Sequence, residues 1–339
     1  MIQNRLRFFC LMGGLLALLA ASCMVALGFG PAPVPLAHVI DIVLAKLNVA
    51  QSGGWSHAEM QIVWQIRAPR VLLGAIVGAG LAVVGTALQA VTRNPLADPH
   101  LLGVSSGAAL GAVLVVLYLG DFAGPLSLSL AAFIGSLGSM LLVLAVASRR
   151  GRLESERLLL AGVAVSFVLM AAVNLLLYTG DQHAVGSVMF WMLGGLGLAR
   201  WELLWLPAFC VLMGLMMLLG LARALNALMS GEQTAISLGF NTRQVRGQVF
   251  VCTAVLTGVL VALSGAIGFV GLMLPHMARR LVGVEHRRLL PVGALLGAVF
   301  VVWVDVAART WIAPQDLPIG IATAALGGTF FIALLHNKP

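Results

Sequence analysis

The sequence predicts an all-α, polytopic membrane protein with about ten transmembrane helices. Hydrophobic residues make up 60% of the 339 residues and charged residues only 9%, whereas soluble domains carry about 25% charge. The mean hydropathy is +1.03, and the apolar residues form runs of ~20 residues without alternation. A chain surrounded by lipid must satisfy its backbone hydrogen bonds internally, so these runs indicate helices.

The runs that are long enough to span a bilayer follow one another along the whole chain. They cover residues 7–29, 70–91, 100–119, 124–147, 158–178, 201–222, 247–264, 266–282, 289–308 and 317–335. The boundary between the seventh and eighth runs is the least marked, because only Ser264 and Gly265 separate them.

The first run leaves two alternatives open. It follows Arg5 and Arg7 and contains Leu19-Ala-Ala-Ser-Cys23, which faintly resembles a lipoprotein cleavage site. A signal peptide has a shorter apolar core of ~7–15 residues, and here the apolar run continues past Cys23. We therefore expect an uncleaved first membrane helix.

The basic residues predict the orientation of the helices. With ten helices, 15 of the 20 Lys and Arg residues fall on the side of the N-terminus. The other side holds Lys46, Arg67, Arg70, Arg200 and Arg309. The positive-inside rule then places both termini in the cytoplasm. It also explains the net charge of +8 better than nucleic-acid binding does, so no nucleic acid is expected as a partner.

Three connections carry features of their own. The outside segment 30–66 opens with three prolines and continues as an amphipathic stretch from His38 to Leu47. The inside segment 223–246 is polar and helix-forming. The apolar stretch from Val185 to Leu198 is too short to span, so we expect a half-buried helix on the outside.

The chain lacks the residues of an ATPase and of an intramembrane enzyme. A phosphate-binding loop needs Gly-Lys-Ser/Thr, and neither Lys46 nor Lys338 follows a glycine. The seven histidines are scattered, and the four cysteines show no paired spacing, so neither a metal cage nor a disulfide is expected. We expect no catalytic residues and no metal or cofactor in this chain.

Ion-coupled transport is also disfavoured, because such carriers use buried carboxylates at mid-membrane depth. Asp305 is the main acidic residue within a run, and Arg309 lies one helical turn further on, so the two residues can pair. If a separate motor protein drives transport instead, its energy would reach the chain through a cytoplasmic contact.

The candidate contact lies between Glu232 and Phe240. These residues are expected to form a short helix that ends at Gly239, which suits insertion into a partner. An ordinary connecting loop is the alternative.

Seven short motifs are spread along the chain: Arg67-x-Pro-Arg70, Arg93-Asn-Pro-Leu-Ala-Asp-Pro99, Leu102-Gly-Val-Ser-Ser-Gly-Ala108, Leu158-Leu-Leu-Ala-Gly-Val163, Ser237-Leu-Gly239, Gly268-Phe-Val-Gly-Leu-Met-Leu-Pro-His276 and Leu317-Pro-Ile-Gly320. With these motifs the chain resembles a known family, the permease subunits of binding-protein-dependent ABC importers for metal chelates (type II importers). The resemblance covers nearly the whole chain. It implies one transmembrane permease domain over residues 1–339 with ten helices, in a bacterial inner membrane.

The resemblance also implies partners. A second copy of the chain would form a homodimer with the pathway along its two-fold axis. Two separate ATPase subunits would bind ATP and Mg²⁺, and a periplasmic binding protein would deliver the chelate. An ion-coupled secondary carrier and an intramembrane enzyme remain as distant alternatives.

Residue roles follow from the resemblance position by position. Arg67, Arg70 and Arg309 match outward arginines that meet acidic residues of the binding protein. The segment with Glu232, Ala235, Leu238 and Gly239 matches the coupling helix that docks on the ATPase. Asn94 and Leu96 match a cytoplasmic constriction, and Ser155 matches a second gate, where the flanking Glu154 and Glu156 depart from the small hydroxyl residues of a relative.

The cargo is not specified by these motifs. Few charged residues lie in the membrane runs, which suits a bulky chelate that the permease grips little, with specificity in the binding protein. A ferric siderophore or haem is the first expectation and cobalamin the second. That order rests on how common these cargoes are in the family.

Overall fold

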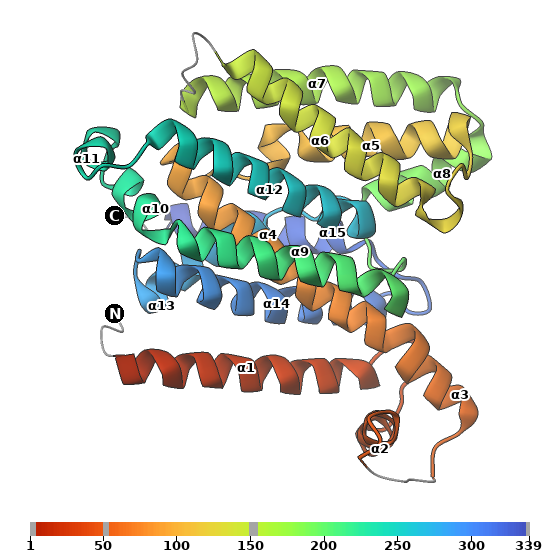
Figure 1. The fold of residues 1–339 in the computed structure, drawn as a ribbon. Coiled ribbons are helices and arrows are strands. Elements are labelled where there is room, and N and C mark those ends of the chain that lie inside the picture. The colour runs from red at the N-terminus through yellow and green to blue at the C-terminus, as the bar shows by residue number, and fades with distance from the viewer. Residues whose placement is uncertain (1–4, 50–53, 149–154, 337–339) are drawn as a thin grey trace.

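The computed structural model describes residues 5–49, 54–148 and 155–336, and over these ranges the chain is helical and contains no strand. Most of the long helices run side by side in one bundle (Figure 1). The α-helices are α1 (Arg5–Gly28), α2 (Leu36–Lys46), α3 (His57–Met60), α4 (Ala68–Thr92), α5 (Val104–Leu114), α6 (Ser127–Ala147), α7 (Ser155–Thr179), α8 (Gln182–Met192), α9 (Trp201–Gly220), α10 (Ala222–Met229), α11 (Glu232–Ser237), α12 (Thr242–Ser264), α13 (Val270–Val282), α14 (His286–Thr310) and α15 (Ile319–His336).

Short segments of other helix types connect or extend these helices. They are the π-helices η1 (Gln61–Arg67) and η3 (Val115–Leu119) and the 3₁₀-helices η2 (Pro99–Leu102) and η4 (Gly124–Leu126).

The described residues contain eight helices that are long and apolar enough to cross a membrane. They include α1, α6, α7, α9, α12, α14, α15 and the continuous helix from His57 to Thr92 that ends with α4. The run predicted at 100–119 is a shorter apolar helix, Val104–Leu119. The run predicted at 266–282 is shorter still, because only Val270–Val282 is helical.

The two ends of the bundle differ. Helices α10 and α11 lie at one end, where α1 also begins and α15 ends, and we call this the α11 end (Figure 1). Helices α2 and α3 lie at the opposite end, which we call the α2 end. The first helix therefore begins, and the last helix ends, at the same end of the bundle. An even number of membrane crossings gives this arrangement.

The centre of the bundle is built from α4, α12 and α14, which are the most enclosed of the long helices. Helix α4 packs most extensively on α14. Glycines allow this approach: a Cβ atom on Gly78 would lie only 2.1 Å from the carbonyl oxygen of Gly297. Small residues at such positions let two helix backbones come into contact. Helix α1 lies at the edge of the bundle and is the least enclosed of the long helices.

The segment between α1 and α4 is more helical than the sequence pattern predicts. The amphipathic stretch forms α2, and the helix that contains α4 already begins at His57. A capping box starts it: the Ser56 hydroxyl accepts from the Glu59 backbone N–H, and the Glu59 carboxylate accepts from the Ser56 N–H. The pattern Ser-x-x-Glu was therefore a readable signal that the prediction from hydrophobicity missed.

The weak boundary after α12 is a true break in the helix. Residues 265–269 are not helical, and Gly265 and Phe269 both have positive φ angles, 61° and 67°. The 13 residues of α13 rise about 20 Å, less than the ~30 Å of a hydrocarbon core. The short helix expected at 185–198 is α8, which starts at Gln182 because Asp181 caps it at the Ala184 N–H, and which already ends at Met192.

Candidate functional site

A cluster of charged residues lies at the α2 end, where η1 and α4 meet the last turn of α14. Helix α4 supplies Arg70, η1 supplies Arg67, and α14 supplies Asp305 and Arg309. Asp305 is 1% exposed, and Arg70 Nε donates to its Oδ1 at 2.9 Å. The predicted pairing of Asp305 with Arg309 is confirmed, with 3.3 Å between Oδ2 and Nε.

Arg67 and Arg309 do not project from the surface, contrary to the outward position implied by the resemblance. Their exposed fractions are 4% and 2%. Arg67 donates to the carbonyl oxygens of Leu27, Gly28 and Ala32, and Arg309 donates to that of Ala26. Because the last carbonyl groups of a helix lack partners within it and carry partial negative charge, cations are favourable there. Both arginines therefore fasten the end of α1 to η1 and α14.

Arg70 is the most accessible of the three arginines, but it too is paired. Its Nη1 donates to Asp316 Oδ2 at 2.5 Å, in addition to the bond with Asp305. Asp316 lies in the exposed connection between α14 and α15. Sequence spacing could not reveal either pair of Arg70, because more than 200 residues separate the partners in the chain.

The predicted coupling segment folds into α10 and α11 at the α11 end. Glu232, the first residue of α11, forms a two-pronged ion pair with Arg246 of α12 at 3.3 and 3.2 Å. Helix α11 ends in a Schellman motif: Phe240 N–H donates to the Ala235 carbonyl, and Gly239 N–H donates to that of Ile236. Gly239 has a φ of 83°, so the predicted glycine stop is confirmed.

The four residues predicted for coupling have different environments. Ala235 is fully buried, whereas Leu238 is 62% exposed, and Gly239 is also exposed. Ile236 adds a second exposed apolar side chain beside Leu238. Helix α11 is thus held by Glu232 and Ala235 and presents Ile236 and Leu238 outward.

Helix α10 is joined to α14 by a junction that the sequence analysis missed. Asn226 Oδ1 accepts from the His286 backbone N–H at 3.0 Å and contacts the His286 ring. Asn226 Nδ2 donates to Glu285 Oε1, and that carboxylate also caps α14 at the Arg287 N–H. The segment that carries α11 is therefore bonded to the first turn of a central helix.

The turn after α4 is also well defined and lies at the α11 end. Arg93 takes a left-handed conformation, and Asn94 Oδ1 accepts from the Leu96 N–H at 2.9 Å, as in an Asx turn. The Leu96 side chain is 54% exposed, whereas Asp98 is buried. Ser155 is the first residue of α7, and its side chain and the preceding residues 149–154 lie outside the described part of the chain.

No group of three His, Cys, Asp or Glu side chains that could hold a metal ion occurs among the described residues. The arrangement is a helical bundle with a charged cluster at one end and a short helix with exposed apolar residues at the other.

The sequence profile of the FecCD transport family matches residues 18–337. The chain belongs to the FecCD transport family. Among the curated FecCD-type relatives, the hemin transport system permease protein HmuU of Yersinia pestis is 41% identical over 317 residues, covering 88% of this chain and 94% of that protein. The vitamin B12 import system permease protein BtuC of Vibrio cholerae is 38% identical over 299 residues, covering 88% and 89%.

A solved structure of a metal-chelate type ABC transporter in an inward-facing conformation also matches this FecCD chain. The TM-score is 0.83 with 32% identity, and the match covers 96% of this chain and 99% of the other. The type II importer permease fold expected from the motifs is thereby confirmed. The chain is a multi-pass membrane protein and an ABC importer permease, and its relatives are transport subunits, not enzymes.

Proposed function

We propose that this chain is the permease subunit of an ATP-driven importer that carries haem or another iron chelate from the periplasm to the cytoplasm. The observation that carries this proposal is the similarity to the hemin permease over nearly its full length. Cobalamin is the second candidate, because vitamin B12 permeases reach 41% identity over 302 residues. The chain would work as one permease domain in the bacterial inner membrane.

The proposed orientation puts the α11 end in the cytoplasm and the α2 end in the periplasm. In support, Arg243, Arg246, Arg279, Arg280 and Arg287 belong to segments at the α11 end, as the positive-inside rule requires. ATP and Mg²⁺ would bind to two separate ATPase subunits at that end. Helix α11 would dock there through Ile236 and Leu238, with Glu232 and Ala235 holding it in place.

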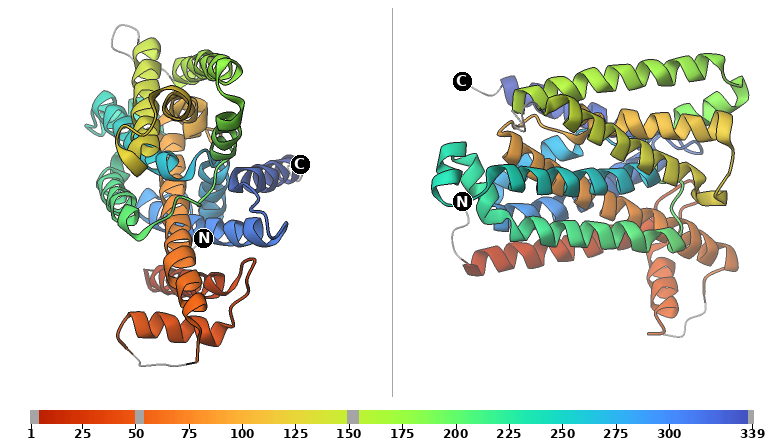
Figure 2. Two further views of the ribbon diagram at one scale, coloured as in Figure 1. Left: turned by 90° about the vertical axis from the view of Figure 1, so that its right-hand side faces the viewer. Right: turned by 45° about the horizontal axis from the view of Figure 1, so that its top comes forward.

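A homodimer is proposed with its pathway along the face formed by α7, α8 and α15. These helices lie along the same side of the molecule (Figure 2, left). Helix α7 exposes large apolar residues along its length, among them Phe167 and Leu175. The Asn94–Leu96 turn and Ser155 at the start of α7 would form the cytoplasmic constriction of this pathway.

A periplasmic binding protein would dock at the α2 end. Arg70 is the one arginine of the cluster with an accessible edge, so we propose it for a direct contact with an acidic residue of that protein. Arg67 and Arg309 would contribute by holding α1, η1 and α14 in the shape that the binding protein recognises. The resemblance implied that all three arginines contact the binding protein directly. We assign this contact to Arg70 alone, because the guanidinium groups of the other two are buried.

The cargo can be tested in proteoliposomes that contain the permease, its ATPase and its binding protein. We expect ATP-dependent uptake of haem, with cobalamin and a ferric siderophore as competing cargoes in parallel samples. Uptake of cobalamin but not haem would reverse the order of the two candidates. Uptake that continues without ATP and stops when the ion gradient collapses would contradict the importer and favour a secondary carrier.

A further inference from the structure

His100 joins two segments that are far apart in the sequence. It lies in η2, directly after the Asn94–Leu96 turn, and Asp98 Oδ1 accepts from its backbone N–H at 2.8 Å. Its ring Nε2 lies 2.9 Å from the carbonyl oxygen of Ile267, in the non-helical segment 265–269. Its Nδ1 lies 2.5 Å from the Ser105 hydroxyl at the start of α5.

The partners indicate which ring nitrogen carries the proton. A carbonyl oxygen only accepts, so Nε2 donates to Ile267. Nδ1 of the neutral ring is then an acceptor, and the Ser105 hydroxyl can donate to it. One neutral tautomer therefore satisfies both bonds and holds the ring between η2, α5 and the segment 265–269.

Ser264, the last residue of α12 and the one before this segment, is bonded to the turn that follows α8. Gly195 N–H donates to the Ser264 carbonyl at 2.8 Å. The start of α15 closes the group, because Ile319 N–H donates to the Gly194 carbonyl and Gly320 N–H to that of Leu193. Backbone bonds thus connect the end of α12, the turn after α8 and the start of α15.

The backbones in this group are in direct contact. A Cβ atom on Gly265 would lie 2.1 Å from the Trp191 carbonyl oxygen. A Cβ atom on Gly320 would lie 2.2 Å from the Leu193 oxygen and 2.8 Å from that of Ala266. Since no side chain separates the three segments, a displacement of one of them must move the others or break the backbone bonds.

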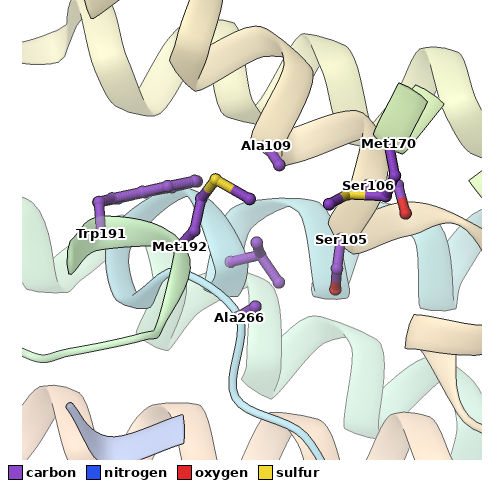
Figure 3. Close-up of a pocket in the computed structure, with 8 residues that line it drawn as sticks. Ser105, Ser106, Ala109, Met170, Trp191, Met192 and Ala266 are labelled. Carbon is purple, nitrogen blue, oxygen red and sulfur yellow. The ribbon is translucent and has the colours of Figure 1, made fainter. Parts of the chain in front are cut away.

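Packing is looser on the other side of the same group. A pocket of about 210 Å³ lies between α5, α7, the end of α8 and Ala266 (Figure 3). Ser105 and Ala109 line it from α5, Met170 from α7, and Trp191 and Met192 from α8. Beside this pocket, the ring of His100 connects α5 and η2 to the segment 265–269.

We propose that His100 is a positioning residue that couples the Asn94–Leu96 turn to α8 and the start of α15 through the segment 265–269. Its role in transport rests on the proposed function, in which the turn is the cytoplasmic constriction and α8 and α15 border the pathway. The physical connection itself does not depend on the cargo or on ATP.

Hydrogen–deuterium exchange of the full chain in nanodiscs tests the connection. We expect His100→Ala to speed exchange about tenfold in peptides covering 191–197, 264–269 and 317–321, the effect expected from losing one or two hydrogen bonds. Ser105→Ala removes only the Nδ1 partner and should give a smaller rise in the same peptides. A rise confined to residues 96–106 in both variants, or no rise, would overturn the proposal.

Matched variants separate positioning from general damage. His57→Ala removes an exposed histidine whose ring contacts Gln61, and it should leave exchange unchanged. His100→Gln can still donate to the Ile267 carbonyl and should restore most of the protection. In proteoliposomes, His100→Ala should reduce uptake while ATP hydrolysis continues. Absence of uptake in the unmodified chain would contradict the proposed function alone, because the exchange result needs neither ATP nor cargo.

Discussion

Arg67 shows why the position of a charge in the sequence does not determine its role. The charge count placed this residue on the side that membrane proteins usually keep poor in arginine. The structure explains its presence there through α1, whose last carbonyl groups accept from the buried guanidinium. An arginine that binds a partner at the surface and one that binds the carbonyl groups of a helix end cannot be told apart in the sequence. In both cases a cation stands at the end of a membrane run.

Replacement of Arg67 tests this reading at the residue scale. We expect Arg67→Ala to lower stability by ~1–3 kcal/mol, because the carbonyl groups of Leu27, Gly28 and Ala32 lose their donor in a buried place. Thermal unfolding in detergent measures the effect. Arg200→Ala, which removes an exposed arginine at the same end, is the control and should unfold at the original temperature. Equal melting temperatures for all three proteins would contradict the structural role.

At the scale of elements, α11 is a short helix that depends on its attachments. Its six residues would not form a stable helix alone. The Glu232–Arg246 pair, the buried Ala235 and the Schellman motif at Gly239 hold it in place. The exposed Ile236 and Leu238 can then be presented in one fixed geometry.

Two substitutions at Gly239 separate backbone conformation from side-chain size. A left-handed φ costs ~1–2 kcal/mol for most residues, whereas asparagine tolerates it better. We expect Gly239→Ala to reduce uptake per ATP hydrolysed and Gly239→Asn to reduce it less, although asparagine is larger. Uptake and ATP hydrolysis measured together in proteoliposomes check this. The opposite order would indicate that the partner requires a small residue at this position, not a left-handed one.

The contact between α4 and α14 gives a second prediction for elements. Gly297→Val should prevent the two backbones from meeting, with a cost of ~1–3 kcal/mol or more for overpacking, since a Cβ atom there lies 2.2 Å from the Gly78 oxygen. Gly293→Ala on the same helix meets its nearest atom at 3.6 Å and serves as control. Size-exclusion profiles and melting temperatures report the outcome. A folded, unshifted Gly297→Val protein would show that the helix pair can separate at no cost.

At the scale of the whole molecule, α7 lies at the edge of the bundle opposite α1 (Figure 1), and α7, α8 and α15 share one side of the bundle (Figure 2, left). The proposed homodimer uses this face, so the two copies would place their α7 helices close together and their α1 helices far apart. In this arrangement α1 would face the lipid, which agrees with the small share of its residues that are buried within the chain.

Cysteine cross-linking in membranes tests the dimer. In a variant that lacks the four native cysteines, Phe167→Cys on α7 should cross-link two copies with a short bifunctional reagent. Phe9 on α1 is equally apolar and comparably exposed in the chain, and Phe9→Cys should give no cross-linked dimer. Cross-linking through α1 but not through α7 would place the interface on the opposite face.

The sequence by itself determined the helical class, the order of the runs and the stop at Gly239, because these depend on local composition and on backbone conformation at single residues. Hydrophobicity alone missed the early start of the helix at His57 and the brevity of α13, because a capping box and a run of irregular backbone do not change mean hydropathy. Only the tertiary structure decided the partners of Arg67, Arg70, Asn226 and His100. Those contacts join residues distant in the chain, and nothing in local spacing records which helices become neighbours.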